Sequence, residues 1–415
     1  MAGIKTRAAH DLQKGRDETA TRGMMAPMER LLRIRAKILS ALTTVEAEDL
    51  RAAEAMGRYL ATPVLARLAS PPYTCAAMDG YAVRAAEVTG EIALPVAQAV
   101  YAGEVPEPLA PGHAARIFTG ATLPPGADAV VREEAVAIEG GSARFRAPAH
   151  PAENVRLAGE DVAEGDEALP AGVRIGARQA ALLAAVGAGT VRVRRRLRVA
   201  VVSTGDELLS GRLPDSNGEA VAAVARAAGA EVRRSSAGDR LEALAAALAE
   251  ALRGADAVVT IGGVSVGSRD LVPAALERLG AETRVHGVPM KPGKPFLFAL
   301  AGGRPVLGLP GSPSACLAAL EVFARPALLA LAGAARIGRP AVPLHLAEPA
   351  HGKPGRARLL WARLDPDGRA RPLGRDTAQV RGPALADVLL CIPEDAGDLP
   401  AGAEVAAWLL ADDAA

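Results

Sequence analysis

The sequence predicts a multidomain protein of the α/β plus β class, with a central α/β domain whose sheet is mostly parallel. Three short apolar runs support this prediction, because such runs are typical of strands buried on both faces; they lie at 197–202, 257–261 and 306–309. Helical patterns fall between them, as in an alternating strand–helix unit. Small, polar or acidic residues follow each run. Ligands bind beyond the carboxyl ends of parallel strands, so we expect these three loops to meet at one crevice.

Length and composition narrow the class of protein. A chain of 415 residues is long enough for two to four domains, each with its own core. Lys plus Arg number 48 and Asp plus Glu 47, and only 3% of residues are aromatic, which argues against a nucleic-acid partner. Cys75, Cys316 and Cys391 lie far apart and are expected to be reduced, as in the cytoplasm. Apolar runs look too short for a membrane span, and Glu321 and Arg325 interrupt the longest of them.

Other segments surround the α/β unit. Residues 1–27 are polar and lack apolar periodicity, which indicates a disordered tail. Helical spacing covers 28–42, and Thr43-x-x-Glu46 resembles a capping box that would begin a second helix ending at Tyr59. Short alternating strands at 91–150 predict a small β-rich domain. A short helix at 176–186 and a basic, solvated connector at 191–196 lead into the α/β unit.

Within the α/β unit and beyond it, the remaining elements follow the same rules. Helices are expected at 218–228, 240–252, 271–279 and 314–331, with a further strand at 231–234. Asp215 and Asp239 precede two of these helices, so each is a candidate N-cap. From Gly338 the pattern changes to short strands, which predicts a β domain with strands at 342–346, 358–364, 388–392 and 405–409.

The loop Gly262-Gly263-Val264-Ser265-Val266-Gly267 is a candidate anion site. Glycines let backbone N–H groups approach a phosphate, and a helix N-terminus follows the loop. The loop has neither the P-loop nor the dinucleotide-binding pattern, and an ordinary turn is the alternative. Asp206, Glu207 and Asp270 would flank it. Carboxylates beside a phosphate indicate Mg²⁺, although each of them could instead be a helix cap or a turn residue.

The segment Met290-Lys291-Pro292-Gly293-Lys294-Pro295 holds two lysines between prolines that restrict the backbone. Like charges held close favour a phosphate or a small oxyanion as partner, and a solvated hairpin tip is the alternative. The sequence shows no serine–histidine–acid arrangement and no Cys/His cluster, which argues against a nucleophilic hydrolase and a zinc enzyme. The parts suit phosphoryl or nucleotidyl chemistry on an anionic ligand.

Nine short motifs, taken together, resemble one family. They are AMDGYAV at 77–83, IFTGA at 117–121, PGADAVV at 125–131, NVRLAGEDV at 154–162, STGDEL at 203–208, DSNG at 215–218, GGVSVGSRD at 262–270, MKPGKP at 290–295 and GLPGSP at 308–313. In this order, over about residues 28–335, the chain resembles the molybdopterin molybdenumtransferases, of the bacterial MoeA and gephyrin E-domain type.

The resemblance implies four domains and a reaction. The domains are an elongated linking domain (28–66 and 163–194), an inserted β-rich domain (67–162), a three-layer α/β domain of the molybdopterin-binding type (195–336) and a C-terminal β-barrel-like domain (337–415). A homodimer is implied, with a cleft between the α/β domain of one subunit and the inserted domain of the other. The implied reaction inserts molybdate into adenylylated molybdopterin, with Mg²⁺-dependent release of AMP. Contact with the molybdopterin adenylyltransferase is a further expectation.

Site residues are carried over by matching motif positions. The resemblance implies catalytic roles for Asp79, Thr119, Asp161, Glu207, Asp239, Asp270, Lys291 and Lys294. Binding of the pterin nucleotide is implied for Gly205, Asp206, Ser216, Gly262, Gly263, Ser265, Gly267, Pro292 and Ser312. Glu207 and Asp270 are the implied Mg²⁺ ligands. On local chemistry alone, Asp79 would be an ordinary Asp-Gly turn residue, and Thr119 could either present its hydroxyl to a ligand or form a turn bond. Asp161 lies in a loop, where binding residues are over-represented but exposed acid pairs are also common.

Two departures leave alternatives open. Ser312 replaces the family's asparagine, and 377–383 replaces a serine-rich contact segment, although Arg356, Arg358 and Arg381 supply positive charge nearby. These departures favour a non-catalytic paralogue that binds molybdopterin as a scaffold or carrier, whereas the retained acids and lysines favour an enzyme. The upstream adenylyltransferase is disfavoured because it needs no inserted β domain.

Overall fold

The computed structural model describes residues 28–265, 267, 270–374 and 378–410. Its chain divides into two compact units, one formed by residues 1–48 and 194–415 and the other by residues 49–193. The predicted disordered tail, 1–27, lies outside the described residues.

A six-stranded sheet forms the centre of the first unit. Its order is β14 (Glu231–Ala237), β13 (Arg198–Thr204), β15 (Ala257–Ile261), β19 (Arg304–Leu309), β18 (Leu297–Ala301) and β16 (Glu282–His286). The first four strands are parallel, and β18 and β16 are added antiparallel. β15 is buried along its whole length, as expected for a parallel strand covered on both faces. The predicted mostly parallel α/β domain is confirmed.

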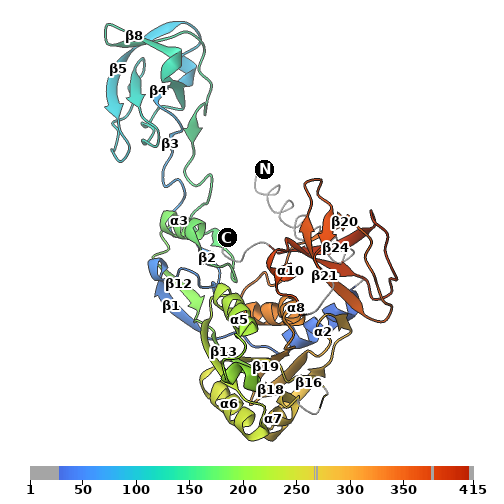
Figure 1. Ribbon diagram of the computed structural model, residues 1–415. Helices are drawn as coiled ribbons and strands as arrows, with labels where there is room; N and C mark the ends of the chain where they lie inside the picture. Colours follow the sequence, from blue (N-terminus) through green and yellow to red (C-terminus); the bar gives the residue numbers. More distant parts are fainter. Residues whose placement is uncertain (1–27, 266, 268–269, 375–377, 411–415) are drawn as a thin grey trace. The chain divides into compact units, whose positions relative to one another are not determined.

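Helices cover both faces of this sheet. α6 (Leu241–Gly254) and α7 (Val272–Arg278) pack on one face, where their apolar side chains share a core with Val202 and Val258. α5 (Ser216–Ala227) and α8 (Pro313–Ala319) lie on the other face (Figure 1). The short α4 (Asp206–Leu209) follows β13 directly. This three-layer arrangement leaves the carboxyl edge of the sheet to the loops that precede the helices.

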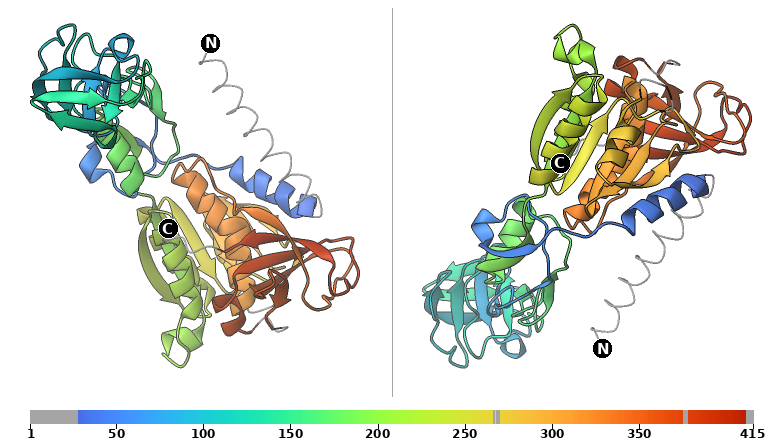
Figure 2. Two further views of the ribbon diagram at one scale, coloured as in Figure 1. Left: turned by 90° about the horizontal axis from the view of Figure 1, so that it is seen from above. Right: turned by 90° about the horizontal axis from the view of Figure 1, so that it is seen from below.

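The helix that begins at α8 continues through a π-helical turn (Leu320–Ala324) into α9 (Arg325–Leu331). Contrary to the prediction, these 19 residues are long and apolar enough to span a bilayer, but 78% of them are buried inside the protein, as in a core helix. Glu321 does not break the helix because Arg339 pairs with it at 3.0 Å. α2 (Glu29–Leu39), the predicted first helix, packs on α9 (Figure 2).

The closing β domain has a five-strand path whose first strand comes from elsewhere in the chain. The order is β17 (Met290–Lys291), β21 (Ala357–Leu364), β23 (Val388–Ile392), β24 (Glu404–Leu409) and β20 (Ala341–His345), with β22 (Ala370–Pro372) paired to β21. The short helix α10 (Arg381–Ala384) contacts β21. β17 belongs to the lysine segment and pairs parallel with β21, with Lys291 opposite Arg358. Thus the C-terminal sheet itself holds the lysine segment.

The second unit contains the predicted β-rich domain. Its sheet has the order β7 (Ala129–Arg132), β4 (Gly80–Val83), β6 (Ala114–Ile117), β5 (Ile92–Val100), β9 (Ser142–Phe145) and β8 (Val136–Glu139). Three two-stranded ladders accompany it: β3 (Cys75–Ala76) with β10 (Val155–Arg156), β2 (Val64–Leu65) with β11 (Glu167–Leu169), and β1 (Ala47–Arg51) with β12 (Thr190–Arg194). α3 (Ala177–Ala185) packs on a 3-10 turn at Ala52–Glu54. Two further 3-10 turns lie at Ala85–Glu87 and Glu133–Ala135.

Three local predictions were wrong. The expected helix from Thr43 to Tyr59 is instead β1 and a 3-10 turn, because the Ala-rich segment pairs with β12 and tertiary pairing overrides helix propensity. The expected basic connector at 191–196 is largely β12. Arg195 within it is no solvated linker residue, since it forms a bidentate pair with Asp256 at 2.7 and 2.8 Å. Asp239 is no N-cap, because Arg240 holds that position of α6.

Candidate functional site

Three strand ends meet at the carboxyl edge of the central sheet. Gly262 follows β15, and a Cβ atom added there would lie 2.6 Å from the Thr204 hydroxyl at the end of β13. A Cβ on Gly311, which follows β19, would lie 3.5 Å from the Gly262 Cα. Asn217, at the start of α5, donates to the Gly311 carbonyl at 2.7 Å. The expected convergence of the three loops is therefore present, and only glycine fits at Gly262, where φ is +85°.

The acidic residues after β13 are held in defined positions. The Asp239 backbone N–H donates to Asp206 Oδ1 at 3.1 Å, so two predicted site residues lie side by side. The Glu207 carboxylate folds back over Gly205, where an added Cβ would lie 2.6 Å from Glu207 Oε1. Gly205 has φ of +141°, which L side chains rarely adopt. This glycine makes room for the Glu207 carboxylate at the strand end.

The glycine-rich loop closes on Asp270. Asp270 accepts the Ser265 N–H and the Gly267 N–H, each at 2.9 Å, on separate oxygens. His286 Nε2 lies 2.9 Å from the Val264 carbonyl, which accepts the ring N–H. Two of the N–H groups expected to bind phosphate are thus already paired with a carboxylate. The order of this loop depends on Asp270 as much as on its glycines.

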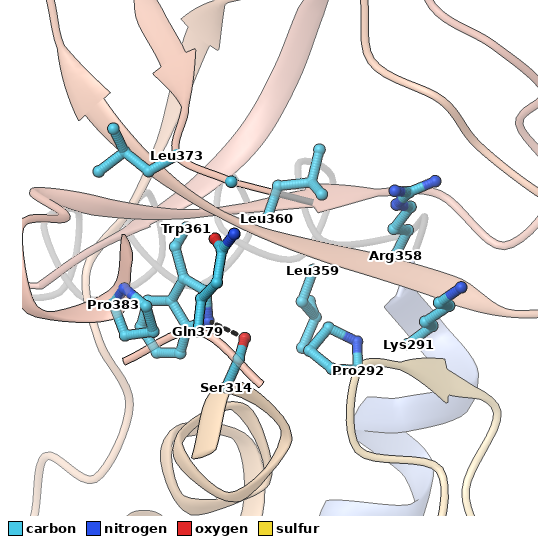
Figure 3. A pocket seen from close by; sticks show the side chains of 11 residues that line it. Lys291, Pro292, Ser314, Arg358, Leu359, Leu360, Trp361, Leu373, Gln379 and Pro383 are labelled. Carbon is cyan, nitrogen blue, oxygen red and sulfur yellow. Dashed lines mark hydrogen bonds between the residues drawn. The ribbon is translucent and has the colours of Figure 1, made fainter. Parts of the chain in front are cut away.

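A pocket lies where the lysine segment and α8 meet the C-terminal sheet (Figure 3). Lys291 and Arg358 stand at one end, with both cationic groups pointing to the same side in Figure 3. At the other end the Trp361 Nε1–H donates to Ser314 Oγ at 3.0 Å. The other lining residues are Pro292, Leu359, Leu360, Leu373, Gly374, Gln379 and Pro383. The pocket therefore joins a cationic end to an end where apolar side chains surround the Trp361–Ser314 pair and Gln379.

The register of β17 against β21 places two positively charged residues opposite each other at the cationic end of the pocket. Lys291 and Arg358 are direct partners in the β17–β21 pair. Like charges opposite each other destabilise a sheet, and a bound anion relieves that repulsion. Lys294 lies in the turn that follows, where its carbonyl accepts the N–H groups of Val288 and Phe296, and its side chain is outside the pocket lining. Arg358 is therefore a cation that the structure places beside Lys291.

The other predicted binding residues are placed as follows. Ser216 is the first residue of α5, which Asp215 caps by accepting the Gly218 N–H at 2.8 Å, as predicted. Ser312 occupies the N-cap position of α8 without a side-chain capping bond. Its hydroxyl therefore does not cap the helix that it precedes. Thr377, within the divergent C-terminal segment, lies outside the described residues.

The second unit contributes a separate polar pair. Asp79 Oδ1 accepts both the backbone N–H and the hydroxyl of Thr119, at 2.7 and 2.8 Å. These bonds stabilise the carboxylate, and they lower the pKa of Asp79. Asp161 belongs to another loop, where its N–H donates to the Ser70 carbonyl at 3.1 Å. Asp79 and Thr119 lie 40 residues apart, and nothing in the sequence indicated that they bond to each other. The resemblance alone named both of them as site residues.

The carboxylates at the sheet edge are the available donors for a divalent cation. Within the described ranges, no group of three or more His, Cys, Asp or Glu side chains is positioned to hold a metal by itself. Asp206 and Glu207 nevertheless lie at the sheet edge with oxygen donors, which Mg²⁺ prefers, and Mg²⁺ commonly takes one or two carboxylates plus substrate phosphate oxygens. The residues fit a cation that is completed by its substrate.

Sequence reasoning missed several pocket residues. Ser314 and Trp361, which lie 47 positions apart in the chain, are both buried and form a hydrogen bond between two domains. Gln379 falls within the segment that departs from the family pattern, and its side chain lines the pocket. The sequence predicted only that Arg358 and its mostly apolar neighbours form a strand. It did not predict which residues this strand contacts.

Three family models match the chain in order. Residues 26–187 match the MoeA N-terminal region (domain I and II), 200–330 a probable molybdopterin binding domain, and 343–410 the MoeA C-terminal region (domain IV). The fold and the site thus define a protein of molybdenum cofactor biosynthesis built around an α/β molybdopterin-binding domain.

Relatives and solved structures agree with this class. Molybdopterin molybdenumtransferase from Nostoc is 38% identical over 77% of this chain and 77% of its own length. Molybdopterin molybdenumtransferase 2 from Mycobacterium tuberculosis is 36% identical over 86% of this chain and 93% of its own. A molybdopterin biosynthesis MoeA structure from Pyrococcus horikoshii is 33% identical with a TM-score of 0.73, and covers 91% of this chain and 98% of that one. The chain belongs to the MoeA family of molybdopterin molybdenumtransferases.

Proposed function

We propose that this protein is a molybdopterin molybdenumtransferase, which inserts molybdate into adenylylated molybdopterin and releases AMP. The observation that carries the proposal is the register pair Lys291–Arg358 at the mouth of the pocket beside α8. Two cations on neighbouring strands suit a compact dianion such as molybdate. Membership of the family supplies the pterin nucleotide as the second substrate.

Each part of the site has a role in this proposal. Lys291 and Arg358 bind the oxyanion, and Pro292 lines the pocket beside them. Ser312, which precedes α8, is a further candidate to bind the pterin nucleotide. At the sheet edge, Gly262 and Gly263 let the substrate approach the backbone closely.

The sheet-edge acids have the complementary role. Glu207 and Asp270 would hold Mg²⁺, with Asp206 as a further candidate ligand. When bound, Mg²⁺ neutralises negative charge on the phosphates of the adenylate. Asp239 orients Asp206 through its backbone N–H. In this proposal the positive charges of Lys291 and Arg358 face the molybdate, and the positive charge of the bound Mg²⁺ faces the adenylate phosphates.

We further propose that two copies form a cytoplasmic homodimer. The motifs that carry Asp79 and Thr119 resemble those of the family, and this resemblance favours a site completed by a second copy. In this arrangement Asp79, Thr119 and Asp161 of one copy would polarise the substrate held by the other. Sedimentation equilibrium tests the dimer, and a monomer at micromolar concentration contradicts it. Direct transfer of substrate from an adenylyltransferase also remains a prediction.

The experiment is a single assay with two variants. Purified protein is mixed with adenylylated molybdopterin, Mg²⁺ and molybdate, and AMP release is followed by chromatography. We expect Glu207→Gln to need more Mg²⁺, and Arg358→Gln to need more molybdate. Release of AMP by Glu207→Gln at the wild-type rate and Mg²⁺ dependence contradicts the role of Glu207. A wild-type protein that binds molybdopterin without releasing AMP would instead be a carrier.

A further inference from the structure

An exposed tyrosine, Tyr101, and a half-buried phenylalanine, Phe118, lie next to the Asp79–Thr119 pair. β5 and β6 run parallel and end together, with Val100 opposite Ile117. The next residue of each strand is aromatic, and the Tyr101 and Phe118 rings stack with centroids 4.6 Å apart at 10°. Tyr101 is 52% exposed even though aromatic side chains favour burial. The pair therefore forms a flat apolar step on the surface of the β-rich domain.

Charge adds to this step. The Arg116 guanidinium lies over the Phe118 ring, 5.2 Å from its centroid, and Arg116 Nη2 donates to Glu133 at 3.0 Å. The loop that carries Tyr101 is fixed at both ends, because the Tyr101 N–H donates to Glu104 and the Glu104 N–H donates back to the Tyr101 carbonyl. Ordered planar groups bind a flat ligand without first losing freedom. We call Tyr101, Phe118 and Arg116 the aromatic step.

We propose that the aromatic step binds the planar heteroaromatic ring of the substrate by stacking. Thr119 follows Phe118 directly and bonds Asp79, so the step adjoins a predicted polar site. Stacking of a fused ring on an exposed aromatic side chain strengthens binding, and a nearby guanidinium adds to it. This inference rests on the proposed function, whose substrate carries two such rings, a purine and a pterin. Both share the chemistry that the step recognises.

The test is a pair of titrations on the full chain. AMP and free pterin are titrated separately, by calorimetry for AMP and by quenching of ligand fluorescence for pterin. We expect Tyr101→Leu to weaken one or both ligands about 5- to 100-fold, and Tyr101→Phe, which restores the ring, to recover the affinity. A loss confined to AMP assigns the purine, and a loss confined to pterin assigns the pterin. Arg116→Gln, measured independently, should give a smaller loss.

Val105 supplies the matched control, since it lies in the same loop and is 94% exposed but has no ring. Val105→Ala should bind both ligands normally. The inference is overturned if Tyr101→Leu and Arg116→Gln both bind like wild type, if Tyr101→Phe fails as badly as Tyr101→Leu, or if wild type binds neither ligand. AMP release separates the two proposals: a wild-type enzyme that releases AMP, with unchanged KM in Tyr101→Leu, contradicts the aromatic step alone.

Discussion

The Trp361 indole donates a 3.0 Å hydrogen bond to the Ser314 hydroxyl, and both residues are more than nine-tenths buried. This bond fastens β21 of the C-terminal sheet to the first turn of α8. Ser314→Ala would leave a buried N–H without its acceptor. We expect a loss of about 1–3 kcal/mol in unfolding free energy, measured by urea denaturation. Ser40→Ala, at an exposed serine, is the control, and equal midpoints for the two variants would contradict the role.

Arg358 can be tested against an arginine on its own strand. Arg358 lines the pocket, whereas Arg363, five positions further along β21, is exposed and outside it. Because a charged hydrogen bond contributes about 1.5–3 kcal/mol, Arg358→Gln should raise the molybdate KM about 10- to 100-fold. Arg363→Gln should not change it. Equal molybdate dependence in both variants would remove Arg358 from the oxyanion site.

Gly205 is predicted to act through Glu207. A Cβ added to Gly205 would lie 2.6–2.7 Å from the Glu207 carboxylate, and φ there is +141°. Gly205→Ala should therefore displace the carboxylate and raise the Mg²⁺ requirement for AMP release. Gly280 also has positive φ, +67°, but open space around it. Gly280→Ala also places a side chain at positive φ, in the less restricted left-handed helical region, and should keep wild-type Mg²⁺ dependence. If both variants respond alike, backbone strain alone explains the effect.

Thr119 should control the ionisation of Asp79. The Thr119 N–H and hydroxyl both favour the charged carboxylate, so the pKa of Asp79 is below its ordinary value. Thr119→Val removes the hydroxyl donor and keeps the N–H. The pKa of Asp79 should then rise, as measured by NMR titration of labelled carboxyl carbons. An unchanged titration would show that the backbone N–H alone sets it. Thr119→Ser should preserve the wild-type titration.

Asp256 should make stability depend on acid. Burial alone would raise the pKa of Asp256, but hydrogen bonds from Arg195 and Arg198 outweigh it and hold the pKa well below the usual range. A pKa depressed by folding gives stability that is fully present above the unfolded value, about 3.9, and that is lost as pH falls on through the lower pKa of the folded state. Asp256→Asn should destabilise by about 2 kcal/mol at pH 7, by somewhat less at pH 3, and by least once the pH falls through the pKa of Asp256 in the folded protein. A pH-independent difference in melting temperature would contradict this account.

The fold was largely predictable because its core elements obey local rules. Val258 and Val259 lie in a run without polar breaks, and Asp215 caps α5 as its position suggests. Prediction failed where distant pairing decides the structure. Ala52 and Ala53 favour a helix locally, yet β1 before them pairs with a strand about 140 positions away. Long-range partners leave no signature in a short window.

The site residues, like the fold, were predictable where short segments determine them and not where distant partners do. The motifs predicted Glu207, Asp270 and Lys291, because backbone geometry and charge are written into short segments. Arg358 was recognised only as nearby charge, and Trp361 not at all, because their importance comes from the partner opposite them. The spacing of the lysine segment predicted Lys291 and Lys294 as partners, and the structure adds an arginine from another domain, Arg358, beside Lys291.

The two-residue strand β17 has a consequence for how such proteins diversify. It is supplied by the α/β domain but completes the edge of the C-terminal sheet. If the last domain were exchanged between relatives, the strand that pairs with β17 would change. The position of Lys291 would then change too, although no residue near it in the sequence had been replaced. Selectivity among oxyanions then depends on two domains together. A change in one of them must be matched by a change in the other, in evolution or in engineering.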